Sequence, residues 1–274
     1  MKKNLILIIL QIVSQYNFAQ IAKKDSLNYR FLLVASGIYA TSVTGLSLVW
    51  YQKFNHTKFH LFNDGPEWLQ MDKVGHGFSA FYMNRILHEN LRENNLLLST
   101  ATTQIYLLGI ELLDATQADW GFSIWDEIAD LSGSLLYIAS SRYGITVTPK
   151  FFYNPTIFPQ YAPNLLGHNF AENILKDYNG QSYWLAFDIP GTKFLTIDFG
   201  YSANGMIGGR TNPSNFLFTR TRQFYLSPGI NLTKIPTQKK WLQQLFKILN
   251  IIKIPLPAVG ISSDGQWLIK FANY

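Results

Sequence analysis

The order of apolar and polar residues divides the chain at about residue 145. Before that point, apolar residues at helical spacing predict helices over about 68–91, 96–115 and 123–143. An earlier segment, 31–51, has 21 residues and no charge, which is the length that a helix needs to cross the hydrocarbon core of a membrane. Its small residues suit either close packing between membrane helices or burial in a soluble bundle.

After residue 145 the pattern becomes that of strands. Four prolines in a tyrosine- and phenylalanine-rich segment predict an irregular connection over 146–181. Ser263-Asp264-Gly265 is a hairpin signal that pairs the segments on either side of it. Aromatic and β-branched residues, with glycine turns between them, predict strands over 182–189, 193–201, 223–232, 257–262 and 266–271.

An amphipathic helix is predicted between these strands, over 238–250. Its lysines oppose tryptophan, leucine and phenylalanine, which suits either a lipid interface or a helix that covers the sheet. The sequence therefore predicts an α+β fold, with a membrane-associated bundle of about four helices over 28–145 and an antiparallel β region over 182–274. The β region also suits part of an outer-membrane barrel, although such barrels begin at about eight strands.

The first residues have the order of a secretory signal. Met1-Lys2-Lys3 is basic, Leu5 to Val13 is apolar, and Ala19 is a small residue at a cleavage position. We expect residues 1–19 to be removed and the chain to be exported to a bacterial envelope, at a periplasm-facing membrane, with the outer membrane favoured over the inner one. The chain has no cysteine, which excludes disulfides and a lipobox anchor.

The composition also favours a membrane protein. Hydrophobic residues make up 47% of the chain and charged residues only 15%, which is less charged than a usual soluble domain. Loss of Lys2 and Lys3 lowers the formal net charge from +6 to +4. This surplus suits membrane lipid, lipid-linked sugar phosphates or other envelope proteins as partners, whereas its dispersion argues against nucleic acid.

Three ionisable pairs lie in or beside the apolar helices. Charged groups are costly in a membrane or a packed interior, so such pairs mark a functional site or a satisfied polar network. The spacing within each pair is i,i+3 or i,i+4, which places both members on one face of a helix. The pairs are Asp72 with His76, Glu111 with Asp114, and Asp126 with Asp130.

One interpretation of these pairs is a metal site. Carboxylates with one imidazole suit a divalent cation such as Mg²⁺, Mn²⁺ or Zn²⁺. Asp130 or Asp114 would then act as acid or base, because crowded carboxylates raise the pKa of one of them. The predicted metal ligands are Asp72, His76, Glu111 and Asp126.

The other interpretation is a structural network. Lys73 and Arg85 are spaced to neutralise Asp72 and Glu111. Ser123 with Asp126 fits a capping box, which makes both residues local helix starters. The chain has no nucleophile elbow, phosphate loop, dinucleotide fingerprint or zincin motif. Four histidines outside the pairs are expected at the surface, namely His56, His60, His88 and His168.

Three short patterns resemble the VanZ-like membrane proteins: Asp72-Lys73-x-x-His76, Glu111-x-x-Asp114 and Asp126-x-x-Ala129-Asp130-x-x-Gly133. With Trp120-Gly121-Phe122-Ser123 before the last of them, they are more similar to the YfiM-like family of uncharacterised envelope proteins. The resemblance covers about residues 30–145 and extends, through 175–184, into the second half of the chain.

The resemblance implies a membrane-linked helical domain over 28–145 with no established activity, and VanZ-like proteins are linked to glycopeptide (teicoplanin) resistance. Two departures matter. Position 130 is Asp where the VanZ-like pattern usually has Asn, which adds a negative charge and favours a metal or a raised pKa. The lipoprotein character of some YfiM-like members does not carry over, because no cysteine is present.

The sequence therefore leads us to expect an envelope protein with a non-catalytic role in maintaining or assembling the cell surface. The alternative is a metal-dependent hydrolase or transferase that acts on a lipid or a lipid-linked glycan. Metal that is lost from a folded His76→Ala variant would favour the enzyme, whereas a variant that unfolds would favour the network.

Overall fold

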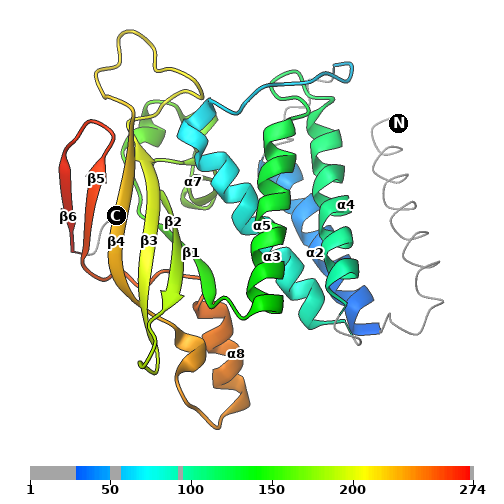
Figure 1. The fold of residues 1–274 in the computed structure, drawn as a ribbon. Helices are drawn as coiled ribbons and strands as arrows, with labels where there is room; N and C mark the ends of the chain where they lie inside the picture. Colours follow the sequence, from blue (N-terminus) through cyan, green and yellow to red (C-terminus); the bar gives the residue numbers. More distant parts are fainter. Residues whose placement is uncertain (1–28, 50–56, 92–94, 272–274) are drawn as a thin grey trace. The chain divides into compact units, whose positions relative to one another are not determined.

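The computed structural model describes residues 29–49, 57–91 and 95–271. It has helices α2 to α8 and a six-stranded antiparallel sheet, which confirms the predicted α+β class (Figure 1). The chain forms two compact units, which we describe separately. The helical unit is Met1–Asn63 with Ser79–Ile138, and the sheet unit is Asp64–Phe78 with Ala139–Tyr274. The predicted signal peptide, 1–19, lies outside the described residues.

Four helices contribute to the helical unit. A buried apolar cluster of Ala35, Leu87 and Leu91 packs α2 against the end of α3. The predicted helix bounds agree with the structure to within three residues. The four are α2 (Tyr29–Val49), α3 (Met71–Glu89), which enters this unit at Ser79, α4 (Leu96–Asp114) and α5 (Ile124–Tyr143).

Local hydrogen bonds fix where α4 and α5 begin. The Asn95 side chain accepts from the backbone N–H of Leu98 at 3.0 Å, and the Ser123 hydroxyl accepts from the N–H of Asp126 at 3.1 Å. Both bonds satisfy N–H groups that the first turn of a helix leaves without a partner. α5 ends before Gly144, whose φ of 65° is the left-handed conformation that favours glycine after a helix.

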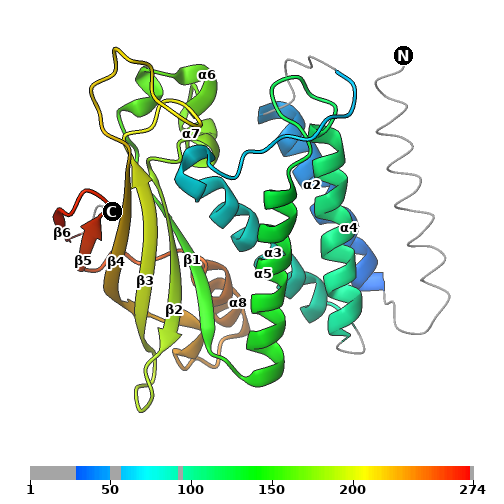
Figure 2. The same ribbon diagram turned by 45° about the horizontal axis from the view of Figure 1, so that its top comes forward.

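The sheet unit contains six strands in which each pairs antiparallel with the next along the chain (Figure 2). Five of them, β2 to β6, correspond to predicted strands. The predicted hairpin is confirmed, since Ser263-Asp264-Gly265 joins β5 to β6 and Gly265 has a φ of 84°. The strands are β1 (Val147–Tyr153), β2 (Gln181–Asp188), β3 (Leu195–Asn204), β4 (Thr221–Ile230), β5 (Ala258–Ser262) and β6 (Trp267–Lys270).

β1 corrects the prediction of an irregular connection over 146–181. Pro149 argues against a strand in the sequence, because proline cannot donate a ladder hydrogen bond. Two residues on, the Phe151 N–H points away from β2 and donates to the Ile251 carbonyl at 2.8 Å. Backbone N–H groups two residues apart in a strand point to the same side, so an N–H at position 149 would also point away from β2. The ladder between β1 and β2 therefore loses no hydrogen bond at Pro149. The same segment also holds η2 (Phe158–Gln160), α6 (Pro163–Leu166) and α7 (Phe170–Lys176).

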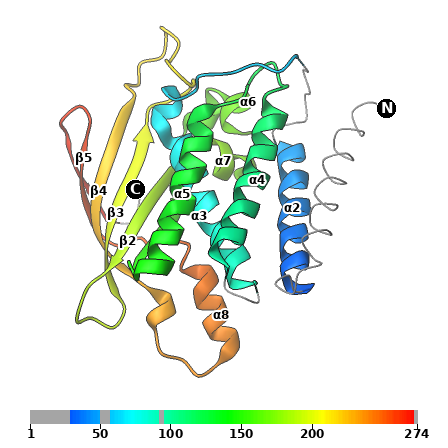
Figure 3. The ribbon, with the colours of Figure 1, turned by 45° about the vertical axis from the view of Figure 1, so that its right-hand side comes forward.

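The chain that follows α8 covers the outer edge of β1. After η3 (Leu232–Lys234), α8 (Lys240–Leu249) lies at one end of the strands (Figure 3). The chain then runs beside β1, where the Lys253 N–H donates to the Phe151 carbonyl at 2.9 Å. Backbone groups that an edge strand would expose are thereby paired.

The covered face of the sheet carries buried charges. Lys150 of β1, Asp198 of β3 and Lys253 are each at most 1% exposed. The Lys253 ammonium lies 3.0 Å from a carboxylate oxygen of Asp198, and the Lys150 ammonium lies 3.9 Å from the same oxygen. One carboxylate therefore faces two cations.

Hydrogen bonds from β4 complete the environment of both lysines. Lys253 donates to the Ser227 hydroxyl at 3.0 Å and to the Pro228 carbonyl at 2.7 Å, while Lys150 donates to the Ile230 carbonyl at 2.7 Å. The Lys253 ammonium also lies 5.0 Å from the ring centre of the buried Trp184, a cation–π distance. Such bonds offset the cost of removing each charge from water.

We predict that Asp198→Asn destabilises the protein strongly. The variant has nearly the same shape but leaves two buried ammonium groups without a counter-charge, a change that costs about 3–5 kcal/mol. Chemical denaturation followed by tryptophan fluorescence measures this loss, because Trp184 lies beside the site. Arg210→Gln is the matched control, since it breaks an ion pair to Glu67 whose arginine side chain is 53% exposed, and we expect at most about 1 kcal/mol. Equal losses would contradict the buried-charge account.

Candidate functional site

The predicted site residues are divided between the two units. Each unit holds two of the four predicted metal ligands, so the metal site stays a prediction. The sheet unit holds Asp72, Lys73 and His76, in the first two turns of α3, and the helical unit holds Arg85, Glu111, Asp114, Ser123, Asp126 and Asp130.

Glu111 joins α4 to the start of α5. Its carboxylate accepts from the backbone N–H of Ser123 at 2.8 Å, and the Ser123 hydroxyl in turn caps α5 at Asp126. All three side chains are buried. The prediction that Ser123 starts this helix is therefore confirmed, whereas the Ser123 N–H, from which Asp126 would accept in a capping box, is bonded to Glu111. Asp114, one turn after Glu111 on α4, is half-buried, and its predicted role as acid or base stays a prediction.

A second link between α4 and α5 runs through Gln104. Its amide donates to the Ser134 hydroxyl at 2.9 Å and to the backbone carbonyl of Asp130 at 3.3 Å. Asp130 is fully buried in the same turn of α5. Burial of this acid within apolar helices was predicted, but its neighbours Gln104 and Ser134 were missed.

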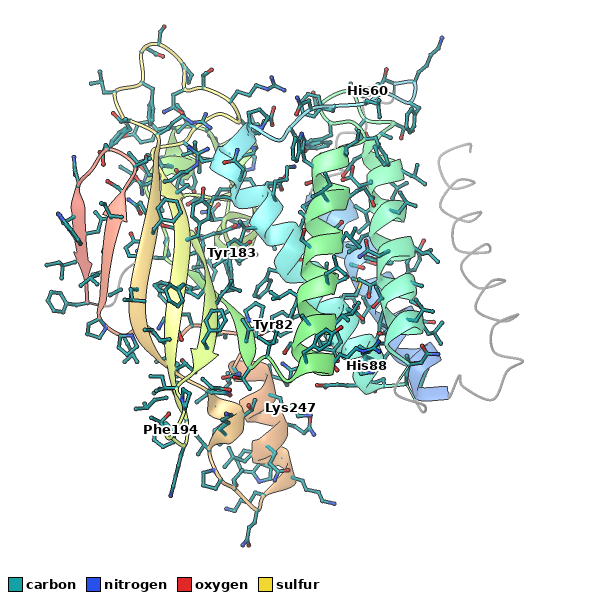
Figure 4. All side chains as sticks on the ribbon, in the orientation of Figure 1. His60, Tyr82, His88, Tyr183, Phe194 and Lys247 are labelled. Carbon is teal, nitrogen blue, oxygen red and sulfur yellow. The ribbon has the colours of Figure 1, made fainter. Side chains whose placement is uncertain are left out.

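α3 is tied to both other helices by polar side chains. Asn84 donates to the Thr100 hydroxyl at 2.9 Å and accepts from the Ser99 hydroxyl at 2.7 Å, which joins α3 to α4. His88 Nδ1 lies 2.7 Å from the Tyr137 hydroxyl, which joins α3 to α5 (Figure 4 labels His88). Hydrogen bonds between side chains thus connect every pair among these three helices.

The expectation that His88 is a surface residue was wrong. It is 6% exposed, and its ring also meets Tyr137 edge-on at 5.7 Å. Its spacing of four residues from Asn84 was the missed signal, because residues four apart share a helix face. Arg85, predicted to neutralise Glu111, forms an ion pair with Glu89 at 2.9 Å.

The helices bury polar side chains and expose apolar ones. On α4 the buried side chains are Ser99, Thr103, Leu107 and Glu111, four residues apart, and three of the four are polar. On α5 they include Asp126, Asp130 and Ser134, again four apart. The exposed large apolar side chains of the two helices include Leu97, Ile105, Leu108, Leu112, Ile124, Trp125, Ile128, Leu131 and Leu135. This is the reverse of a helix that packs its apolar face into a soluble core.

Among the described helices, α4 is the one that is long and apolar enough to cross a membrane. Of the segment predicted to span, 31–51, part lies outside the described residues, and its described apolar helical part is Leu33–Ser42.

In the sheet unit, α3 starts from a left-handed turn. Trp68, Leu69 and Gln70 have φ angles of 48°, 50° and 64°, although none of them is glycine. Such residues cost about 1–2 kcal/mol each, so other contacts must hold them in place. The Trp68 N–H donates to the Gly209 carbonyl at 2.7 Å, and the Gln70 side chain accepts from Arg222 at 2.6 Å.

Asp72 follows this turn and is held by several partners. The Lys73 ammonium lies 2.8 Å from one of its oxygens and also 2.6 Å from Asp64, and the Tyr178 hydroxyl donates to its other oxygen at 2.8 Å. Partial burial raises the pKa of Asp72, but the charges of His76 and Lys73 and these hydrogen bonds outweigh it, so the pKa lies below its ordinary value of 3.8. The predicted neutralisation of Asp72 by Lys73 is confirmed.

Comparison of the chain with family models, with curated proteins and with solved structures gives no match. The resemblance to the VanZ-like and YfiM-like families therefore stays a prediction.

We predict that Asp72 makes stability fall in acid. A carboxyl whose pKa is lower in the folded state stabilises the fold above its unfolded value of about 4, and this contribution is lost as the pH falls through the folded pKa. Asp72→Asn should therefore be less stable than the wild type at pH 7, with a difference that shrinks below about pH 4. Denaturation midpoints over a pH series measure it. Lys73→Met, which removes the ammonium that lies 2.8 Å from Asp72, should shrink the same difference. A difference that does not change with pH would contradict this role.

Proposed function

We propose that this protein is an integral membrane protein of a bacterial cell envelope, with a non-catalytic role in maintaining or assembling the cell surface. The main support is that α4 and α5 bury polar side chains and expose apolar ones. Apolar side chains exposed on both helices would be unfavourable in water but are favourable against lipid acyl chains.

The dimensions of α4 support a membrane span. Nineteen residues at 1.5 Å each give a helix of about 28 Å, close to the 30 Å of a hydrocarbon core. Its outward side chains include Ile105, which is 71% exposed, and no Asp, Glu, Lys or Arg lies between Leu96 and Ile110. Glu111, near the end of the helix, is turned inward to Ser123.

The buried polar side chains support a structural role in this setting. Lipid provides no hydrophobic drive for helices to associate, so packing and interhelical hydrogen bonds decide which faces meet. Asn84, Gln104 and Glu111 each make such bonds between helices at 2.7–2.9 Å. Side chains that form these bonds fix the register of the helices, which is a structural role.

We predict that Ile105→Asp prevents stable membrane integration. Aspartate in the middle of a spanning helix costs about 3 kcal/mol relative to isoleucine, whereas on a water-exposed helix face the change would be close to neutral. The amount of protein that remains in alkaline-washed membranes measures the effect. Leu217→Asp is the control, since Leu217 is 95% exposed in the loop between β3 and β4 and should tolerate the charge. Retention of both variants at the wild-type level would contradict a spanning α4.

We predict that Glu111→Gln retains function and that Glu111→Leu does not. Glutamine keeps an acceptor for the buried Ser123 N–H, whereas leucine leaves it without one, at about 1–3 kcal/mol. Each variant is expressed in a strain that lacks the protein, and membrane protein level and resistance to detergent are measured. A Glu111→Gln protein that accumulates normally without restoring resistance would contradict the non-catalytic role. So would stoichiometric divalent metal, found by elemental mass spectrometry in the wild type and lost in this variant.

A further inference from the structure

The sheet, considered by itself, also has its polar side chains inside and its apolar side chains outside. Along β3, Thr196 and Asp198 are 1% and 0% exposed, whereas Ile197 and Phe199 are 38% and 51% exposed. Successive residues of a strand point to opposite faces, so one face of the sheet is buried and holds its charged and hydroxyl side chains beside a small cluster of Trp184, Tyr225 and Ala258, and the other is apolar and open. A soluble antiparallel sheet with one exposed face shows the opposite alternation.

The open apolar face continues from strand to strand without a polar break. One row of paired residues crosses five strands and consists of Leu185, Phe199, Leu226, Val259 and Ile269. A second row on the same face crosses these strands two residues along and consists of Tyr183, Tyr201, Phe224, Ile261 and Trp267. We call these two rows the apolar face.

Part of the apolar face is covered within the sheet unit. Phe78 of α3 contacts the Tyr183 ring with centroids 5.5 Å apart, and the Tyr201 hydroxyl donates to the Leu69 carbonyl. On β4, β5 and β6, the side chains of both rows are exposed, from 39% for Leu226 to 79% for Trp267. An exposed apolar surface that crosses several strands marks an interaction site.

The charge at the α8 end of the sheet favours membrane lipid as the occupant. From Lys234 to Lys253 the chain contains five basic side chains and no acidic one. Two of the five pair with acidic side chains of the sheet unit, Lys234 with Asp188 at 2.9 Å and Lys253 with Asp198 at 3.0 Å. The other three, Lys239, Lys240 and Lys247, are exposed, at the start of α8 and along it.

α8 combines these lysines with its own exposed apolar side chains. Trp241, Leu245 and Ile248 are exposed on the same helix, whose charged residues are all basic. Figure 4 shows Lys247 at the end of the sheet where Phe194 lies, in the turn between β2 and β3. This is the composition of a helix that lies at a lipid interface, with apolar side chains among acyl chains and lysines at phosphate groups.

Strand length separates the inner strands of the apolar face from the outer ones. β3 and β4 have 10 residues each, within the about 9–11 that a tilted strand needs to cross a hydrocarbon core, whereas β5 and β6 have five and four. A protein partner would explain the apolar face alone. Membrane lipid explains the apolar face and the basic α8 end together.

We propose that the apolar face and α8 form a lipid-binding surface. Acyl chains contact the two rows, and Lys239, Lys240 and Lys247 contact the phosphates of anionic phospholipid headgroups at the α8 end. This inference rests on the proposed membrane location and assigns a second lipid contact, on the sheet unit, besides α4.

Spin labels test the acyl-chain contact, because the chain contains no cysteine and each label therefore has a single attachment site. Full-length variants Phe199→Cys, Val259→Cys, Ile105→Cys and Leu217→Cys are labelled in nanodiscs and exposed to oxygen, which enters lipid, or to a water-soluble nickel chelate. We expect labels at 199 and 259 to be broadened by oxygen and protected from nickel, as at 105, whereas the label at 217 responds to nickel.

The two proposals fail in different ways. Nickel access at 199 and 259, with oxygen-dominated broadening at 105, would overturn the lipid-binding surface and leave the membrane location intact. Protection of 199 and 259 from both reagents would also overturn it, in favour of a protein partner or a second copy of this chain. Nickel access at 105 would overturn the membrane location itself.

Lipid composition tests the headgroup contact. An Ile248→Cys label on α8 is compared in nanodiscs of phosphatidylcholine and of phosphatidylcholine with phosphatidylglycerol. We expect nickel access to fall when the anionic lipid is present, and we expect this shift to be lost in a Lys239→Gln, Lys240→Gln, Lys247→Gln background. Equal access in both lipids would overturn the role of the lysines, and a shift that survives the triple substitution would overturn their assignment.

Discussion

The burial of charged and hydrogen-bonding side chains, with apolar ones left outside, is the constraint on which both units depend. A charge removed from water must recover several kcal/mol from its partners, so each one dictates the position of its neighbours. Asp198 requires Lys253 and Lys150 on the inner face of the sheet, and the two ammonium groups require the hydroxyl and carbonyl groups of β4. Polar pairs thus decide which elements meet.

The same constraint explains why three helices of one unit are joined through polar side chains. In water, apolar stripes would choose the partner of each helix, but α4 turns much of its apolar surface outward. Asn84, Gln104 and Glu111 therefore decide the register of the helices, each at a different level along them.

Helices α2 to α5 and α8, and five of the six strands, could be predicted from apolar periodicity and turn residues, whereas the short α6 and α7 could not. β1 could not, because whether Pro149 harms a strand depends on which way its missing N–H would point. Burial of Glu111, Asp126 and Asp130 followed from charges in apolar segments, whereas their neighbours did not. Gln104 and Ser134 are neutral residues that sit equally well at a surface, and their roles arise only when two helices are side by side.

The left-handed turn at Trp68–Gln70 left no mark in the sequence, since it contains neither glycine nor asparagine. Three successive residues in this conformation are unfavourable by themselves, and the groups that hold them, on Gly209 and Arg222, belong to β4 and to the loop before it. The turn is therefore stable only where β3 and β4 are paired. The start of α3, with Asp72 and His76, thus depends on residues more than 130 positions later in the chain.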